Sequence, residues 1–176
     1  MVESIAKMTP EDLFLKYAFP CTIVKVARKE ITQQEYESLE QAAKENQPVS
    51  RERLEKTYPA AVARMKAVAK EKGQVYFSEE NIRDYFLGRH NELLRGTFKP
   101  TKEQGPALDE NLPQAIRELC LITTGKIVKK GEAFYVVEFA AGKETKRRAV
   151  SNMLASDAEI GNVIRMHYGY AVEKVS

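Results

Sequence analysis

The stretch "LCLITTGKIVKKGEAFYVVEFAAGKETKRRAV", residues Leu119–Val150, decides the fold class of this protein. Three runs rich in β-branched and aromatic residues follow one another in it, separated by the turns "KKGE" and "AAGKE". Such residues favour strands, and glycine in a short connection favours a hairpin turn. The stretch therefore predicts three strands joined by two hairpins.

Two more strand-like runs, "NVIRMHYG" and "YAVEKV", follow after the glycine-containing turn "AEIGN". All five runs lie in the last third of the chain. An open sheet of this size leaves unpaired edges, whereas closure into a barrel removes them. We therefore expect a small five-stranded OB-like β-barrel in a domain spanning residues 114–176.

The chain before this sheet carries helix signals. Thr9 is followed by Pro10, a cap and a first helical residue, and Thr32 with Glu35 forms a capping box. The same reasoning places further caps, breaks and ends at Pro20, Ser50, Pro59, Ser78 and Gly96. We therefore expect a helical bundle over residues 1–97.

A change of composition separates the two parts. The segment "TFKPTKEQGPALDENL" contains two prolines and a glycine and has no apolar periodicity, which is typical of a linker. We assign residues 98–113 to this linker. The predicted fold class is thus α+β, an N-terminal helical bundle followed by a small β-barrel.

The composition bounds the function. Of the 176 residues, 43% are hydrophobic and 30% are charged, as in a soluble globular protein, and the net charge is only +3. A protein held by nucleic-acid phosphates usually shows a denser basic face, so the charge favours another kind of partner. The start "MVESIAKM" lacks an export signal, and no apolar run is long enough to span a bilayer. Two distant cysteines predict no disulfide framework, so we expect a cytoplasmic protein without a membrane partner.

Motifs for catalysis are missing from the sequence. It contains no phosphate-binding glycine loop, no dinucleotide glycine pattern, no Cys-x-x-Cys and no His-Glu-x-x-His. No nucleophile and base can be paired from spacing alone, so we expect that the protein is not an enzyme. Of the few residues with metal or nucleophile chemistry, Cys21 is interpreted as a small buried apolar residue and His90 as a surface or packing histidine.

Two end motifs of the predicted barrel become informative together. "LCLITTGKIV" places Cys120, Gly125 and Lys126 at its start, and "HYGYAVEKV" places His167 and Gly169 at its end. The pair resembles the HypC/HupF family of hydrogenase-maturation chaperones, small β-barrel proteins with a leading cysteine motif and a closing His-x-Gly-aromatic-Ala motif. Tyr170 and Ala171 complete the second motif, and the resemblance covers about residues 118–176.

The resemblance implies a function in assembling the iron centre of nickel–iron hydrogenase. Family members act with HypD and bind the precursor of the hydrogenase large subunit. Carried over, Cys120 and His167 would contact a transiently held iron, with no cofactor stably bound. The residues implied in partner binding are Cys120, Gly125, His167, Gly169 and Tyr170. A thiolate and an imidazole are ligands that suit iron, and two ligands alone bind weakly enough to release it.

Two other functions remain open from the sequence. One is a β-barrel adaptor for protein partners without a metal role, in which Cys120 is buried beneath the helical domain. The other is a single-stranded nucleic-acid-binding OB-like protein. Its basic and aromatic face would consist of Tyr135, Lys143, Lys146, Arg147, Arg148 and Tyr168.

Overall fold

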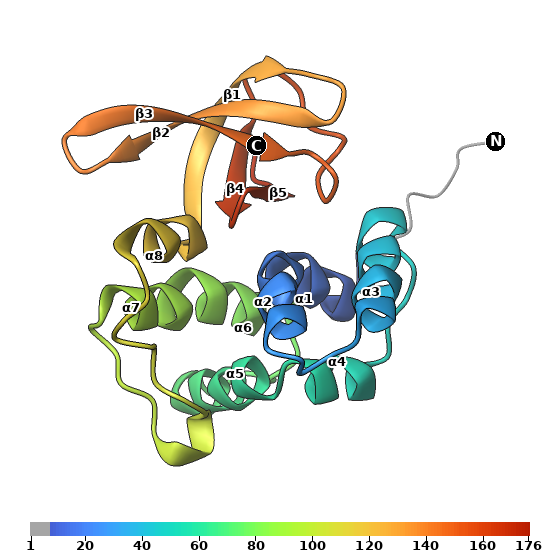
Figure 1. The fold of residues 1–176 in the computed structure, drawn as a ribbon, viewed down its shortest axis with the longest axis vertical. Coiled ribbons are helices and arrows are strands. Elements are labelled where there is room, and N and C mark those ends of the chain that lie inside the picture. Colours follow the sequence, from blue (N-terminus) through green and yellow to red (C-terminus); the bar gives the residue numbers. More distant parts are fainter. Residues whose placement is uncertain (1–7) are drawn as a thin grey trace.

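The computed structural model describes residues 8–176 and consists of a layer of helices beneath a closed barrel (Figure 1). The α+β fold class predicted from the sequence is confirmed. The first residues, in which we expect no export signal, lie outside the described part. Within residues 8–176, no helix has the length and apolar character needed to cross a membrane.

The helices begin and end close to the predicted capping and breaking residues. Thr9 and Thr32 each close a capping box, with Asp12 and Glu35 respectively, and Pro20 forms a 3-10 turn between the first two helices. Asn46 and Gly73 end two helices in the left-handed conformation. The helices are α1 (Pro10–Ala18), α2 (Thr22–Ala27), α3 (Gln33–Glu45), α4 (Arg51–Thr57), α5 (Pro59–Lys72), α6 (Glu79–Asp84), α7 (His90–Arg95) and α8 (Gln114–Cys120). We call α1–α7 the helical layer.

A π-helical turn, Tyr85–Arg89, connects α6 to α7. The sequence predicts one continuous helix here, from the cap at Ser78 to the glycine at Gly96. Such turns add a residue to the helix and are frequent at functional sites. In this protein His90 follows the turn directly, as the first residue of α7.

Five strands close into a barrel in the order β1-β2-β3-β5-β4. All neighbouring pairs are antiparallel except β3 with β5, which meet in parallel at Ser151 and Tyr170. The strands are β1 (Thr123–Lys130), β2 (Phe134–Ala141), β3 (Glu144–Ser151), β4 (Val163–His167) and β5 (Tyr170–Lys174). Alternate side chains point inward, and Tyr135, Val137 and Met166 are fully buried in the barrel core.

Gly125 keeps one wall of the barrel closely packed. A Cβ atom at this position would lie 2.6 Å from Cγ1 of Val137 and 2.7 Å from the carbonyl oxygen of Glu138. Both distances are shorter than van der Waals contact. The glycine of the first motif is therefore required by the packing of β1 against β2.

The prediction that the first strand begins near Leu119 is wrong by four residues. The chain remains helical through Cys120, and the N–H of Leu121 still donates to the carbonyl of Arg117. Asn91 in α7 then pairs with both backbone groups of Ile122, at 2.9 Å each. This contact supplies hydrogen-bond partners for the backbone N–H and C=O of the residue between helix and strand. Short-range sequence patterns do not reveal such a contact.

The hydrophobic core of the helical layer extends into the barrel domain. Ile122, Leu154 and Val172 of the barrel domain belong to the same buried cluster as Phe14 and Phe19 of the N-terminal helices. The linker also packs on the helical layer. Its Gly105 lies against Ala60, and Arg64 donates to the carbonyl of Pro106 at 2.7 Å. The two parts are thus fastened together directly and through the linker.

Candidate functional site

The end motifs meet where the barrel rests on the helical layer. The turn between β4 and β5 lies at the lower end of the barrel in Figure 1, next to α8. There the N–H of Tyr168 donates to the carbonyl of Leu119 at 2.9 Å. This hydrogen bond joins the residue before Cys120 to the residue after His167. The two residues that the family resemblance singles out therefore belong to one region.

His167 is buried, with an exposed fraction of 1%. Its Nδ1 lies 2.7 Å from the carbonyl oxygen of Tyr17, and because a carbonyl only accepts, Nδ1 carries the proton and donates. Burial lowers the pKa of His167 to about 4, although the hydrogen bond to Tyr17 favours the charged form. The ring is thus neutral at pH 7, and Nε2 offers a free lone pair.

Cys21 faces that lone pair, with its Sγ 3.3 Å from Nε2 of His167. It stands in the 3-10 turn that Pro20 imposes between α1 and α2. The interpretation of Cys21 as a packing residue from sequence therefore missed a polar contact across the two parts of the fold. A cysteine directly after a proline in an apolar helix carries no local signal of such a contact.

The two thiols shift each other's pKa in opposite directions. Hydrogen bonding to Cys120, together with burial, raises the pKa of Cys21 well above its usual value. The same hydrogen bond lowers the pKa of Cys120. Cys21 is thus the thiol that keeps its proton, and Cys120 is the one that loses it more readily. Cys120 has an exposed fraction of 8%.

His90 completes the group, and of the two alternatives offered by the sequence, a surface or a packing histidine, its ring contacts fit the second. It is half-buried, and its ring meets the ring of His167 edge-to-face with centroids 5.0 Å apart. Burial, reinforced by His167, lowers the pKa of His90 to about 3. We call Cys21, His90, Cys120 and His167 the junction cluster.

Asn91 orients His90 and anchors Cys120 at the same time. Its Nδ2 donates to the carbonyl of Ile122 and its Oδ1 accepts from the N–H of Ile122, so the amide orientation is determined. Nδ1 of His90 lies 3.4 Å from that Oδ1 and donates to it. The junction cluster therefore presents two neutral imidazoles and two thiols held by backbone contacts.

The remaining predicted site residues have structural environments around the cluster. Gly169 adopts φ +81° in the tight β4–β5 turn, where an L side chain would be strained. Tyr170 packs edge-to-face on Phe19 of the helical layer, with centroids 6.0 Å apart. Gly125 lies in the barrel wall, as described above. Gly169 and Tyr170 thus help to seat the barrel on the helices.

The donor types of the junction cluster suit a soft metal ion, since thiolate and neutral imidazole are its preferred ligands. A metal-binding histidine usually donates its other ring N–H to a carbonyl or carboxylate, as Nδ1 of His167 does to the carbonyl of Tyr17. Within residues 8–176, however, no three His, Cys, Asp or Glu side chains are grouped so that they could hold a metal ion together.

A buried ion network lies beside the cluster and joins the two parts. Glu173 of β5, with a side chain 10% exposed, accepts from Arg83 of α6 at 2.6 Å and pairs with Arg165 of β4. Tyr17 of α1 donates to the same carboxylate. Although burial opposes ionisation, the hydrogen bonds from Arg83 and Tyr17 hold the pKa of Glu173 below its usual value.

The basic and aromatic face predicted for nucleic-acid binding loses one of its aromatic residues in the structure. Tyr135 is fully buried, and its hydroxyl lies 2.8 Å from the carbonyl of Ala155 and 3.0 Å from that of Ala158. Its ring is therefore not available for base stacking. The sequence misassigned its face because the alternation of β2 fixes which side chains share a face but not which face points inward.

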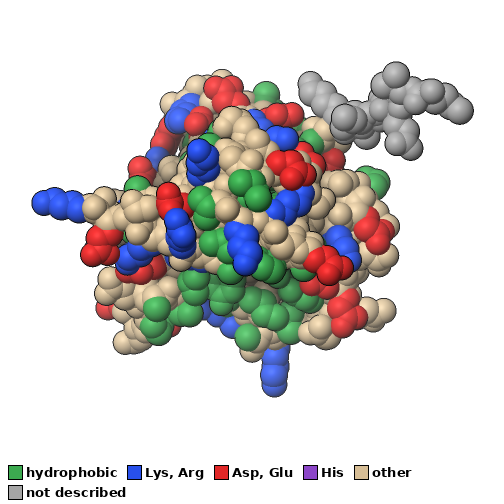
Figure 2. Space-filling model, turned by 90° about the horizontal axis from the view of Figure 1, so that it is seen from above, with side chains coloured by type: hydrophobic (Ala, Val, Ile, Leu, Met, Phe, Trp, Pro, Cys, Tyr) green, Lys and Arg blue, Asp and Glu red, His purple; other side chains and the backbone are tan. Residues whose placement is uncertain are grey.

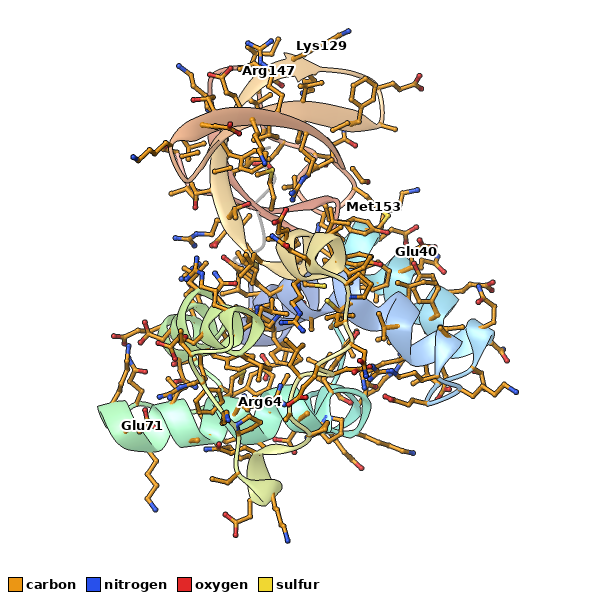
Figure 3. All side chains as sticks on the ribbon, turned by 60° about the vertical axis from the view of Figure 1, so that its left-hand side comes forward. Glu40, Arg64, Glu71, Lys129, Arg147 and Met153 are labelled. Atoms are coloured by element: carbon orange, nitrogen blue, oxygen red, sulfur yellow. The ribbon has the colours of Figure 1, made fainter. Side chains whose placement is uncertain are left out.

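The basic residues of the barrel are dispersed. Lys129 and Arg147 stand at the end of the barrel far from the helices (Figure 3), and Arg147 pairs with Glu138. On the barrel-side surface in Figure 2, Lys and Arg side chains alternate with acidic and apolar ones. This surface lacks the continuous basic stripe expected of a phosphate-binding face.

Comparison of the chain with protein-family models, curated proteins and solved structures finds no match.

Proposed function

We propose that this protein is a HypC-like maturation chaperone that helps to assemble the iron centre of nickel–iron hydrogenase. In this function it contacts a HypD-like maturation protein and the precursor of the hydrogenase large subunit. One observation carries the proposal. Two motifs far apart in the sequence, one with Cys120 and the other with His167, are joined at one end of a closed barrel by the hydrogen bond from Tyr168 to Leu119, and Nε2 of His167 is unprotonated.

The chemistry of the cluster supports this role. Cys120 is the more acidic of the two thiols and is the donor to the iron cargo or the contact to a partner. His167 supplies a neutral imidazole, held in the correct tautomer by the carbonyl of Tyr17. In this function the helical layer covers the site, so a partner gains access by displacing α1 and α2 from the lower end of the barrel.

The test is copurification of the full chain with a HypD-like protein and with a large-subunit precursor. Wild type is expected to form both complexes, and Cys120→Ala is expected to weaken them at least about tenfold because the working thiol is lost. Cys21→Ala is the matched control, since it removes a thiol of the same cluster that keeps its proton. Absence of both complexes with wild type, or equal binding by Cys120→Ala, would refute the proposal.

A second candidate function is a protein-interaction adaptor without a metal role. The small exposed fraction of Cys120, 8%, favours it, because a working thiol must be reached. Alkylation of the native protein distinguishes the two functions. Rapid modification of Cys120 when a partner is added supports the chaperone. Protection of Cys120 with the partner bound, together with loss of binding on substitution of exposed residues of the helical layer, supports the adaptor.

A further inference from the structure

One edge of strand β3 has no neighbouring strand over most of its length. β2 pairs with β3 along all of Glu144–Ser151, whereas β5 begins where β3 ends and meets it only at Ser151. The β2–β3 hairpin projects to the left of the barrel in Figure 1. We call the unpaired side of residues 144–150 the free edge. We propose that the free edge binds an extended segment of a partner protein that carries two acidic side chains at alternate positions. This inference goes beyond the proposed function, since it requires neither a thiol nor iron.

The free edge presents backbone groups that face away from β2. The N–H of Ser151 donates to the carbonyl of Gly169 at 2.8 Å, which shows on which side of β3 its groups lie. The register of β3 against β2 is continuous, so the N–H and C=O groups alternate sides along the strand. Those of Thr145, Arg147 and Ala149 therefore point the same way as those of Ser151. These groups have no backbone partner within residues 8–176.

A partner strand can reach the free edge. The residues from Glu144 to Arg147 are exposed, as is Ala149, and Arg148 is half-buried. This access is required, because an added strand must lie about 4.8 Å from β3. Natural proteins often block an exposed edge with a proline or a bulge, and β3 contains neither. The free edge is thus able to pair by main-chain hydrogen bonds, as in other cases of strand addition.

The charges of β3 define the chemistry of the partner. Lys146, Arg147 and Arg148 against Glu144 give the strand a net charge of 3 − 1 = +2. Arg147 lies on the outer face of the barrel wall, where it pairs with Glu138. Lys146 and Arg148 share the opposite face, and neither forms a salt bridge within residues 8–176. Two acidic residues separated by one position in an added strand would lie next to both.

Arg148 distinguishes a binding role from simple protection of the edge. Its guanidinium lies over the ring of Phe139, 5.0 Å from the centroid, and its Nη1 is buried without a hydrogen-bond partner. A charge that serves only to prevent aggregation needs to be solvated, whereas a buried donor without a partner costs free energy. A carboxylate on an added strand would supply the missing acceptor in a charge-assisted hydrogen bond.

Two other occupants match the free edge less well. A second copy of the chain, paired through its own β3, would place three basic side chains beside three more. A nucleic acid would match the charge, but its phosphates supply no donors for the backbone C=O groups. A peptide strand supplies both donors and acceptors. An acidic extended peptide is therefore the occupant that satisfies the backbone and the side chains together.

The experiment selects binders of the full chain from a phage-displayed library of random peptides of about twelve residues, long enough to span the free edge. The enriched sequences are expected to carry acidic residues at alternate positions among strand-forming residues. A synthetic, labelled peptide of this kind is then titrated by fluorescence anisotropy, with oligothymidylate as the competing probe. No enrichment of acidic peptides, or tighter binding of oligothymidylate than of the peptide, would overturn the inference.

Variants of the chain and of the peptide test the two sources of affinity separately. Arg148→Gln is expected to weaken binding of the selected peptide at least about tenfold. Arg147→Gln, the matched control on the opposite face, should weaken it less than about threefold. A peptide methylated on alternate backbone nitrogens keeps its charge but loses its donors to β3, so it should bind at least about tenfold more weakly. Equal affinity of the methylated and unmethylated peptides would show attraction by charge alone and would contradict strand addition.

Amide hydrogen exchange of the wild-type chain locates the bound peptide without any substitution. The amide protons of Thr145, Arg147 and Ala149 should exchange at least about tenfold more slowly with saturating peptide, because each gains a backbone acceptor. The amide proton of Val150, which faces β2, is the internal control and should change little. Unchanged exchange at all three positions of the free edge would place the peptide elsewhere and refute the proposal.

Discussion

The two ends of the barrel carry polar residues of similar type in opposite environments. At the lower end, Glu173 is 10% exposed and joins α1 and α6 to the barrel through Tyr17 and Arg83. On the outer face, Glu138 is 38% exposed and pairs with Arg147, which is 67% exposed. The lower end also contains Cys120 and His167 and faces Cys21 and His90 of the helical layer, whereas the outer face is a mixture of solvated charges.

The difference in solvent exposure indicates which part of the molecule can hold reactive or ligand-binding side chains. A charge on the outer face is screened by water and contributes little to stability. A charge or imidazole at the lower end has lost its water and depends on a few fixed partners. At the lower end, burial lowers the pKa of both histidines, and these buried neutral imidazoles beside the cysteines are the physical basis for placing the function there.

The largest expected effect tests the ion networks at the two ends. Glu173→Ala removes the partner of two half-buried arginines, Arg83 and Arg165, and should lower the free energy of unfolding by about 3–5 kcal/mol. Glu138→Ala, the matched control on the outer face, should lower it by less than about 1 kcal/mol. Urea unfolding followed by circular dichroism measures both. Equal losses for the two variants would mean that the two ends do not differ energetically.

The dependence of stability on pH tests whether the histidines at the lower end are buried and neutral. The pKa of His167 is near 6.5 in the unfolded chain and about 4 in the fold, so the unfolded chain binds protons first as pH falls. Stability is therefore full above pH 6.5 and is lost between pH 6.5 and 4. From pH 7 to pH 5 the loss from His167 should be about 2 kcal/mol, and His90 acts in the same direction.

Urea unfolding at both pH values measures this loss. Few carboxylates titrate between pH 7 and pH 5, so the window reports mainly on the histidines. A His167→Asn variant should show a smaller difference between the two pH values, whatever its absolute stability. An unchanged free energy of unfolding in wild type would contradict the buried neutral imidazole.

Adding one methyl group to the closely packed wall of the barrel should lower its stability. Gly125→Ala places a Cβ atom 2.6 Å from Val137 and should cost about 1–3 kcal/mol of stability. Gly88→Ala is the control, because a Cβ there meets no atom within 4 Å and alanine favours helical structure. Thermal unfolding should give a lower Tm for the first variant and an unchanged or higher Tm for the second.

The smallest expected effect concerns Tyr135, the residue excluded from base stacking. Tyr135→Phe removes a buried hydroxyl that donates to the loop before β4 and should cost about 1 kcal/mol. Tyr168→Phe, in the β4–β5 turn, serves as the comparison and should cost less. If Tyr135→Phe unfolds at the same urea concentration as wild type, its hydroxyl is not held as the structure has it.

Much of the fold could be predicted because its signals are local. The capping boxes at Thr9 and Thr32, the interruption at Pro20 and the glycine-bearing turns between strands act over a few residues. The five short strand-like runs also predicted a small barrel, because closure removes the unpaired edges of so small a sheet. The start of the first strand was misplaced because Asn91, distant in sequence, supplies the contact that separates helix from strand.

The candidate site was only half predictable. Cys120 and His167 were identified from their motifs, and the structure brings these motifs to one end of the barrel. Cys21 and His90 were missed because neither has a partner at short spacing. Cys21 reaches His167 across 146 positions of sequence.

The sequence by itself determined the secondary structure, the order of the two parts and the motifs at the ends of the barrel. The tertiary structure decided which end of the barrel the helical layer covers and which face of β2, the one with Tyr135, points inward. It also decided which thiols and imidazoles lie close together. Local patterns express the preferences of the backbone and the alternation of side chains, which depend on near neighbours. The junction cluster depends on how two hydrophobic surfaces pack, and that packing is a property of the whole chain.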